Sequence, residues 1–186
     1  MIDTVLNYLG NGSAITLIVL LWLSLYFLLC FWIFIYRYLS VKSSIFNEKK
    51  SLDALASRNA SLAPTSALYK CANGANKKEI LNACEINIIK EASSGVSWLS
   101  IIASTSPFIG LFGTVVGILE SFAKFSSQTK VGFSVIAPAI SEALVATAAG
   151  IFVAIFAYTF HQILTRKVYE LNTFIKAQSE ILIAKG

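Results

Sequence analysis

The sequence predicts an all-α membrane protein with three transmembrane helices, and three observations carry that prediction. Hydrophobic residues make up 56% of the 186 positions and charged residues only 13%, against roughly 45–50% and 25% in soluble domains. Nearly uncharged stretches cover residues 14–36, 92–119 and 131–165. The basic residues lie between these stretches without interleaved aromatic side chains, so the net charge of +5 indicates membrane orientation signals and not a nucleic-acid partner.

The first predicted transmembrane helix is residues 14–36, preceded by a short N-terminal segment, 1–13. Its 23 residues hold no charge and would form a helix of about 34 Å, enough to cross a hydrocarbon core of about 30 Å. Trp32, Tyr36 and Arg37 are typical of an aromatic and cationic anchor at the membrane interface.

A polar segment, residues 37–94, follows and carries nine of the fifteen Lys and Arg residues. Apolar side chains recur in it at helical spacing, as at Ile80, Cys84 and Ile88, on the far side of a break at 73–76. The pattern predicts a compact extramembrane part built from amphipathic helices, whose charges form an ordinary solvated face.

The three cysteines are Cys30, Cys71 and Cys84. They form no CxxC pair, and none has metal-ligand spacing with the single histidine, His161. We therefore expect all three to be reduced structural thiols, and we expect no metal or cofactor.

The second predicted transmembrane helix is residues 95–119. It contains Pro107 and the pair Gly113 and Gly117, spaced so that another helix can approach closely. Plain helix packing is the default meaning of such a pair, since hydrophobicity alone gives no association between helices in lipid.

A short link, residues 120–132, leads to the third predicted transmembrane helix, 133–162, and a polar tail, 163–186. Side chains in the tail recur at helical spacing and predict that the third helix continues past the membrane; they are Val168, Leu171, Phe174 or Ile175, Gln178 and Leu182.

Charge counting predicts the orientation. The segment 37–94 has nine Lys and Arg residues and the tail has four, against none before the first span and two in the link. The positive-inside rule therefore places the large segment and the tail in the cytoplasm, with the second and third helices extended into it. The N-terminus and the link are expected on the periplasmic side.

Glu142 is the only charged residue in any of the three spans. A carboxylate there costs about 2.5–3.5 kcal/mol on insertion scales, and such residues often mark ion paths. With no cation in its own chain's span, the group is expected to be neutral when dry and ionised when water or a partner's charge reaches it, as a proton relay requires. The alternative is a structural acid bonded to Ser141, Thr147 or a neighbouring helix.

Two hydroxyl groups are candidates to act with Glu142: Thr147 on the same helix and Thr114 on the second. Thr147 lies about 140° around the helix from Glu142, beside it and not beneath it. Either hydroxyl can hold water or relay a proton, or can bond to a carbonyl one turn earlier.

Enzyme functions find no support in the sequence. It has one histidine and lacks the HExxH, GxSxG and P-loop motifs, and the spans contain no pair of carboxylates. We therefore predict that the protein is not an enzyme.

Two stretches resemble a known family. Residues 106–119, SPFIGLFGTVVGIL, resemble the second helix of the ExbB/TolQ proteins, which share ancestry with MotA, and residues 137–150, APAISEALVATAAG, resemble their third. The resemblance covers residues 95–165 well and the rest by layout. It departs at Val116, where the family often has Trp, and at Phe156, where it often has Pro.

The resemblance implies a proton-channel subunit of a bacterial inner-membrane motor. Such proteins form pentameric helical bundles around transmembrane helices of ExbD or TolR, whose membrane Asp accepts the proton, and they act on TonB or TolA. The family's glutamate falls on Glu142, and its pore-lining threonines fall on Thr114 and Thr147. Helix-packing positions fall on Gly110, Gly113, Gly117 and Gly150.

The short N-terminal segment favours TolQ, and hence the Tol-Pal system of envelope integrity and division, as the main expectation. An ExbB-like subunit energising TonB-dependent uptake is the alternative within the same mechanism. A third hypothesis is a non-conducting membrane scaffold in which Glu142 only fixes the register of the helices.

Overall fold

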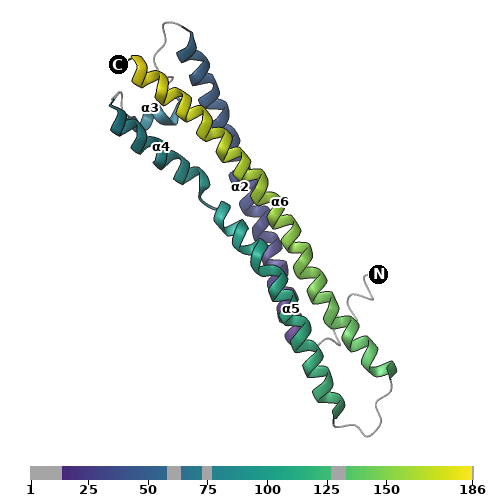
Figure 1. The fold of residues 1–186 in the computed structure, drawn as a ribbon. Helices are drawn as coiled ribbons and strands as arrows, with labels where there is room; N and C mark the ends of the chain where they lie inside the picture. The colour runs from purple at the N-terminus through teal and green to yellow at the C-terminus, as the bar shows by residue number, and fades with distance from the viewer. Residues whose placement is uncertain (1–13, 58–63, 73–76, 127–132, 186) are drawn as a thin grey trace. The chain divides into compact units, whose positions relative to one another are not determined.

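The computed structural model describes residues 14–57, 64–72, 77–126 and 133–185, and their regular secondary structure is entirely helical (Figure 1). The predicted all-α fold is thus confirmed. The helices are α2 (Ala14–Ala56), α3 (Ala67–Ala72), α4 (Lys78–Ser93), α5 (Val96–Ser126) and α6 (Phe133–Lys185).

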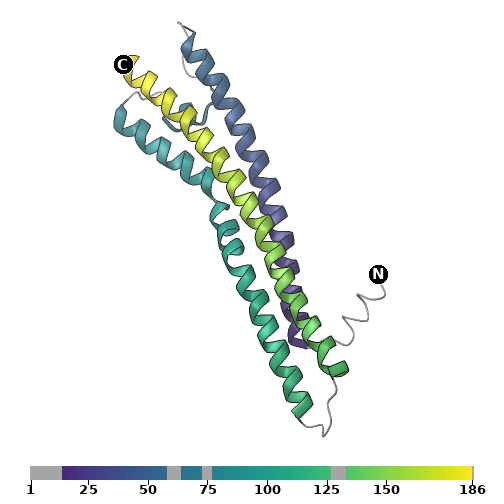
Figure 2. The same cartoon turned by 45° about the vertical axis from the view of Figure 1, so that its right-hand side comes forward.

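Three helices are long and apolar enough to cross a membrane, as the sequence predicted: α2, α5 and α6. Helix α6 continues without interruption to Lys185, as Figure 2 shows, so the predicted extension of the third span is present. The first helix is extended as well, because α2 continues 20 residues past Tyr36, to Ala56. The second span was also predicted to extend into the cytoplasm, but α5 begins at Val96 and the polar residues ahead of it form a separate helix, α4.

The chain divides into two compact units, to which α2, α5 and α6 each contribute residues. Unit 1 comprises Met1–Phe31 and Trp98–Thr159, and unit 2 comprises Trp32–Ser97 and Phe160–Gly186.

Unit 1 buries small and aliphatic side chains between its helices and exposes large apolar ones. Leu23, Leu99 and Ala146 are at most 1% exposed, whereas Leu21 and Phe108 are 72% and 70% exposed. An apolar exterior on helices of this length is suited to lipid or to other subunits, and not to water.

An aromatic cluster joins α2 to α6 in unit 1. Phe156 packs edge-on against Phe27, with 5.6 Å between the ring centroids. Phe31 and Phe152 also lie against it, at 6.0 and 4.9 Å. Phe156 therefore anchors α6 to α2 within unit 1.

Unit 2 has its own hydrophobic core, to which four helices contribute. Its fully or nearly buried members are Leu55, Leu68, Leu81, Cys84, Leu171, Ile175 and Leu182. Leu171, Ile175 and Leu182 come from the predicted helical stripe of the tail, which is thereby confirmed as the buried face of α6.

The break between α4 and α5 is at Gly95, whose φ of +88° is a left-handed conformation that side-chain-bearing residues rarely adopt. A Cβ on Gly95 would lie 3.2 Å from Nε of Arg37. The Arg37 guanidinium and the Ser94 backbone N–H both donate to the Glu91 carbonyl, at 3.4 and 3.1 Å, and so satisfy an acceptor left free at the end of α4. Gly95 thus allows the chain to restart as a new helix.

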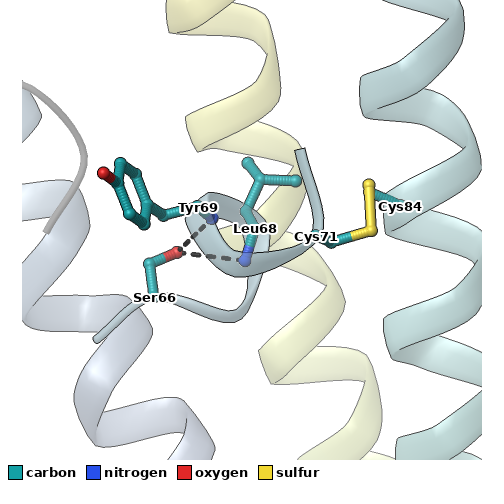
Figure 3. The surroundings of a disulfide bond; sticks show 5 residues. All are labelled: Ser66, Leu68, Tyr69, Cys71 and Cys84. Atoms are coloured by element: carbon teal, nitrogen blue, oxygen red, sulfur yellow. Dashed lines mark hydrogen bonds between the residues drawn. A yellow bond between two sulfur atoms is a disulfide. The ribbon is translucent and has the colours of Figure 1, made fainter. Parts of the chain in front are cut away.

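A disulfide bond joins Cys71 of α3 to Cys84 of α4 (Figure 3). The prediction of three reduced thiols was therefore wrong for these two, and only Cys30, which is buried, is free. The sequence offered no pairing signal because the two cysteines are 13 residues apart and meet only after α3 folds back onto α4.

A buried carboxylate, Glu48, organises the polar interior of unit 2. It is 1% exposed and accepts hydrogen bonds from Ser66 Oγ at 2.8 Å, the Ala67 backbone N–H at 2.6 Å and Gln178 Nε2 at 2.9 Å. Gln178 also donates to the Glu48 carbonyl at 2.8 Å. Glu48 therefore ties α2, the start of α3 and α6 together, and buried donors satisfy its charge.

Replacing Glu48→Ala should destabilise unit 2 by about 3 kcal/mol, because buried donors lose their acceptor. The measurement is the free energy of unfolding of the purified full chain in detergent. The neighbouring Lys49→Ala, at an exposed position, is the control and should change stability little. Equal effects of the two variants would contradict the role of the network.

Candidate functional site

The backbones of α5 and α6 touch at Gly110 and Gly150. A Cβ built on Gly110 would lie 2.6 Å from the Ala146 carbonyl oxygen, and one on Gly150 would lie 2.5 Å from the Ser106 carbonyl oxygen. Both separations are shorter than any tolerable contact, so only glycine permits this approach. Two of the four predicted packing glycines thus face each other across one helix crossing.

The other two glycines lie further along α5, where α2 also approaches. A Cβ on Gly113 would lie 2.9 Å from Val19 Cγ1, and one on Gly117 would lie 3.2 Å from Thr16 Oγ1. One face of α5 therefore packs against both other helices of unit 1, with the tightest backbone approach toward α6.

The close approach brings Thr114 of α5 against Thr147 of α6. Their hydroxyl groups are hydrogen-bonded to each other, and Thr114 Oγ1 also donates to the Ala143 carbonyl at 2.9 Å. Because a hydroxyl has one proton, Thr147 is the donor to Thr114 when Thr114 donates to Ala143. The two hydroxyls then form a short chain that ends at the carbonyl of the residue after Glu142.

Both threonines also lie near the Gly110 carbonyl, at 3.3 Å from Thr114 Oγ1 and 3.4 Å from Thr147 Oγ1. For Thr114 this is the bond to a carbonyl one turn earlier that the sequence left open as its alternative role. At 3.3 Å this bond is longer than the 2.9 Å bond from Thr114 Oγ1 to the Ala143 carbonyl, so the hydrogen bond between the two helices has the better geometry.

Glu142 is half-buried on α6, next to Ala143, which is 1% exposed. Within the described residues its carboxylate has no hydrogen-bond or ion-pair partner. It lies five residues before Thr147, a rise of about 7.5 Å, so the carboxylate and that hydroxyl are not brought into one direct contact. The structure therefore joins the two threonines to each other and not to Glu142.

An apolar groove lies between α2 and α6, on the same face of α6 as Glu142 and on its C-terminal side. Val145, Ala149 and Val153 line it on α6, and Leu20 and Phe27 line it on α2. Val145, Ala149 and Val153 follow Glu142 at helical intervals, so the carboxyl group lies one turn before a surface whose only polar lining residue among those described is Ser24.

Two more hydroxyl residues belong to this site, and one of them, Thr16, was not identified from the sequence. Thr16 of α2 is 3% exposed against Gly117, and Ser106 is fully buried with its hydroxyl bonded to the Ile102 carbonyl. Thr16 is one of only two Ser or Thr residues in the predicted first span, the other being Ser24, and that rarity was the available signal.

Comparison with known proteins identifies the family. Residues 47–177, more than two thirds of the chain, match the MotA/TolQ/ExbB proton channel family. The chain belongs to this family. Its members are non-enzymatic transport proteins of the inner membrane, so the present chain is a multi-pass membrane protein of that kind.

Individual relatives differ in how much of the chain they match. A Helicobacter pylori protein named as an ExbB-like biopolymer transport protein is 41% identical over 189 residues, covering all of both chains. The ExbB of Pseudomonas putida is 43% identical over 79 residues, 42% of this chain and 24% of that protein. The TolQ of Pseudomonas aeruginosa is 38% identical over 96 residues, 52% of this chain and 37% of that protein.

Replacing Gly110→Ala should force α5 and α6 apart and cost about 1–3 kcal/mol, as overpacking a tight contact does. Gly117→Ala is the matched control, because its nearest neighbours, Thr16 Oγ1 and Ala143 Cβ, lie at 3.2 and 3.3 Å, so an added methyl group requires a shift of only a few tenths of an ångström. Thermal unfolding in detergent, followed by circular dichroism, should show the larger loss for Gly110→Ala. The reverse order would contradict the backbone contact.

Proposed function

We propose that this chain is the proton-conducting subunit of an ExbB-like complex that converts proton motive force into mechanical work on the cell envelope. The observation that carries the proposal is Glu142, a carboxyl group inside an apolar span with no partner in the described part of its own chain. The family match supports it, because proton conduction is the family's named activity.

The driving force is sufficient to charge and discharge such a group. One proton crossing about 150–200 mV releases roughly 3.5–4.6 kcal/mol. The insertion cost of the charge is about 2.5–3.5 kcal/mol on translocon scales. The two energies are comparable, so the membrane potential is able to move the group between its neutral and charged forms.

Family membership implies the partners in general terms, and we assign them to this chain as follows. Several copies of the chain, five in the family's pattern, surround single-span helices of an ExbD- or TolR-like subunit, whose membrane Asp faces Glu142. A TonB- or TolA-like protein transmits the mechanical force to the outer membrane. Thr114 and Thr147 belong to the same proton path, and their hydroxyls meet where α5 contacts the helix that carries Glu142.

The large polar segment and the C-terminal part of α6 are assigned to the cytoplasm, and the N-terminus and the 120–132 link to the periplasm. Nine of the fifteen Lys and Arg residues lie between Arg37 and Lys90, which supports this orientation.

The ExbB-like function is favoured over the TolQ-like one that the sequence suggested first. The full-length relative is named for biopolymer transport, whereas the TolQ proteins match only part of this chain. TolQ stays the second candidate, because the TolQ of Haemophilus influenzae is 46% identical over 67 residues.

Glu142→Gln should abolish proton-driven function while leaving assembly intact, because the amide has nearly the same shape but cannot release a proton. The measurement is proton flux into liposomes that hold the chain with its single-span partner. Glu180→Gln, at an exposed position of the same helix outside the predicted span, is the control and should conduct normally. Normal flux in Glu142→Gln would exclude Glu142 from the proton path, and absence of flux in the wild type with its partner would favour the non-conducting scaffold.

A deletion strain separates the two candidate functions. Loss of an ExbB-like subunit should impair growth under iron limitation and leave detergent resistance intact, because such a subunit energises TonB-dependent uptake. Detergent sensitivity with normal growth on scarce iron would assign the chain to the TolQ type instead. The complemented strain is the control in both assays.

A further inference from the structure

The Cys71–Cys84 disulfide has no place in the proton path, and it lies in a part of the chain where disulfides are uncommon. Unit 2 carries the basic residues that favour a cytoplasmic location, and cytoplasmic thiols are kept reduced. A permanent structural bond and this orientation do not fit together. A bond that forms and opens with the redox conditions fits both.

We propose that Cys71 and Cys84 are a reversible redox site, oxidised by disulfide compounds, that fastens α3 to α4 in the oxidised form. The inference rests on the orientation proposed above but not on the conduction by Glu142. It goes beyond that function, since it concerns a modification of unit 2.

The two cysteine residues differ in exposure. Cys71 is exposed at the C-terminal end of α3, whereas Cys84 is 4% exposed and belongs to the core of unit 2 with Leu81 and Leu171. Figure 3 shows the bond crossing from the end of α3 to α4. An oxidant from solution therefore reaches Cys71 first, and Cys84 is held where it can resolve the product.

The exchange proceeds in two balanced steps. The Cys71 thiolate attacks a small disulfide R–S–S–R, forming a Cys71–S–S–R mixed disulfide and releasing one R–S⁻. The Cys84 thiolate then attacks the Cys71 sulfur, which forms the Cys71–Cys84 bond and releases the second R–S⁻. Two protein thiols are oxidised and one disulfide is reduced to two thiols, which take up the two protons.

Helix α3 depends on such an attachment because it is too short to be stable alone. It has six residues, well below the roughly 12–15 at which isolated helices become marginal. Its N-terminal end is held by Ser66 Oγ, which accepts from the Leu68 and Tyr69 backbone N–H groups at 3.2 and 3.4 Å (Figure 3). Ser66 is in turn bonded to Glu48. The disulfide is what holds the C-terminal end.

The first test counts thiols in cells that express the full chain. Proteins are acid-quenched, denatured and alkylated with a maleimide–polyethylene glycol, which adds one mass increment for each free thiol. Wild type should show three free thiols in untreated cells, one after treatment with hydroxyethyl disulfide, and three again after dithiothreitol. The Cys30→Ser variant should show two free thiols in untreated cells, none after hydroxyethyl disulfide, and two again after dithiothreitol.

Two outcomes would overturn the proposal: a Cys71–Cys84 bond already complete in untreated cells, or two thiols that stay free after the treatment. The first would make the bond permanent and would also contradict the cytoplasmic orientation, while leaving the Glu142→Gln flux assay unaffected. Failure of that flux assay would in turn leave the thiol count unaffected.

The second test measures hydrogen exchange of residues 67–72 in the purified full chain. Exchange should be about ten- to a hundredfold slower in the oxidised than in the reduced wild type, since closing a loop of this length has an effect of that order. Cys71→Ser, at an exposed position, should show the same fast exchange with and without oxidant, and Cys30→Ser should behave as wild type. Equal exchange in both states of the wild type would overturn the fastening role.

Discussion

The contact on which unit 1 depends is the backbone crossing of α5 and α6 at Gly110 and Gly150. In lipid, hydrophobicity does not hold helices together, so close packing and interhelical hydrogen bonds must do so. The missing side chains at these two positions let the helices approach until Thr114 reaches Thr147 and the Ala143 carbonyl. The hydroxyl chain beside Glu142 is therefore a consequence of two absent methyl groups.

Two acidic side chains of this chain have opposite surroundings, and the contrast separates structure from function. Glu48 is fully buried and accepts hydrogen bonds from two side chains and a backbone N–H, so residues of the same chain supply the hydrogen bonds that its carboxylate needs. Glu142 lies in an apolar span, and no described residue of the chain forms a hydrogen bond or an ion pair with its carboxylate. A carboxylic acid in apolar surroundings is stable only when it is neutral or when another polypeptide or water supplies a partner for its charge. The proton site that we propose is based on this requirement.

The sequence predicted the features that depend on local pattern. Uncharged runs gave the three long helices, and the spacing of apolar side chains gave the buried face of α6, including Gln178. It missed Glu48 and the Cys71–Cys84 bond, because these depend on residues 130 and 13 positions apart that meet only in three dimensions. The break between α4 and α5 at Gly95 was not predicted for a related reason: the left-handed backbone there lies against Arg37, from a helix distant in the sequence.

Carbodiimide labelling of Glu142 tests the central claim most directly. Dicyclohexylcarbodiimide enters apolar surroundings and reacts with carboxylic acids that carry a proton. The proposed proton site predicts that, in membranes, mass spectrometry will locate the modification at Glu142. A Glu142 that stays unmodified, while the reagent labels a known membrane carboxyl group added as a standard, would contradict the proposed site.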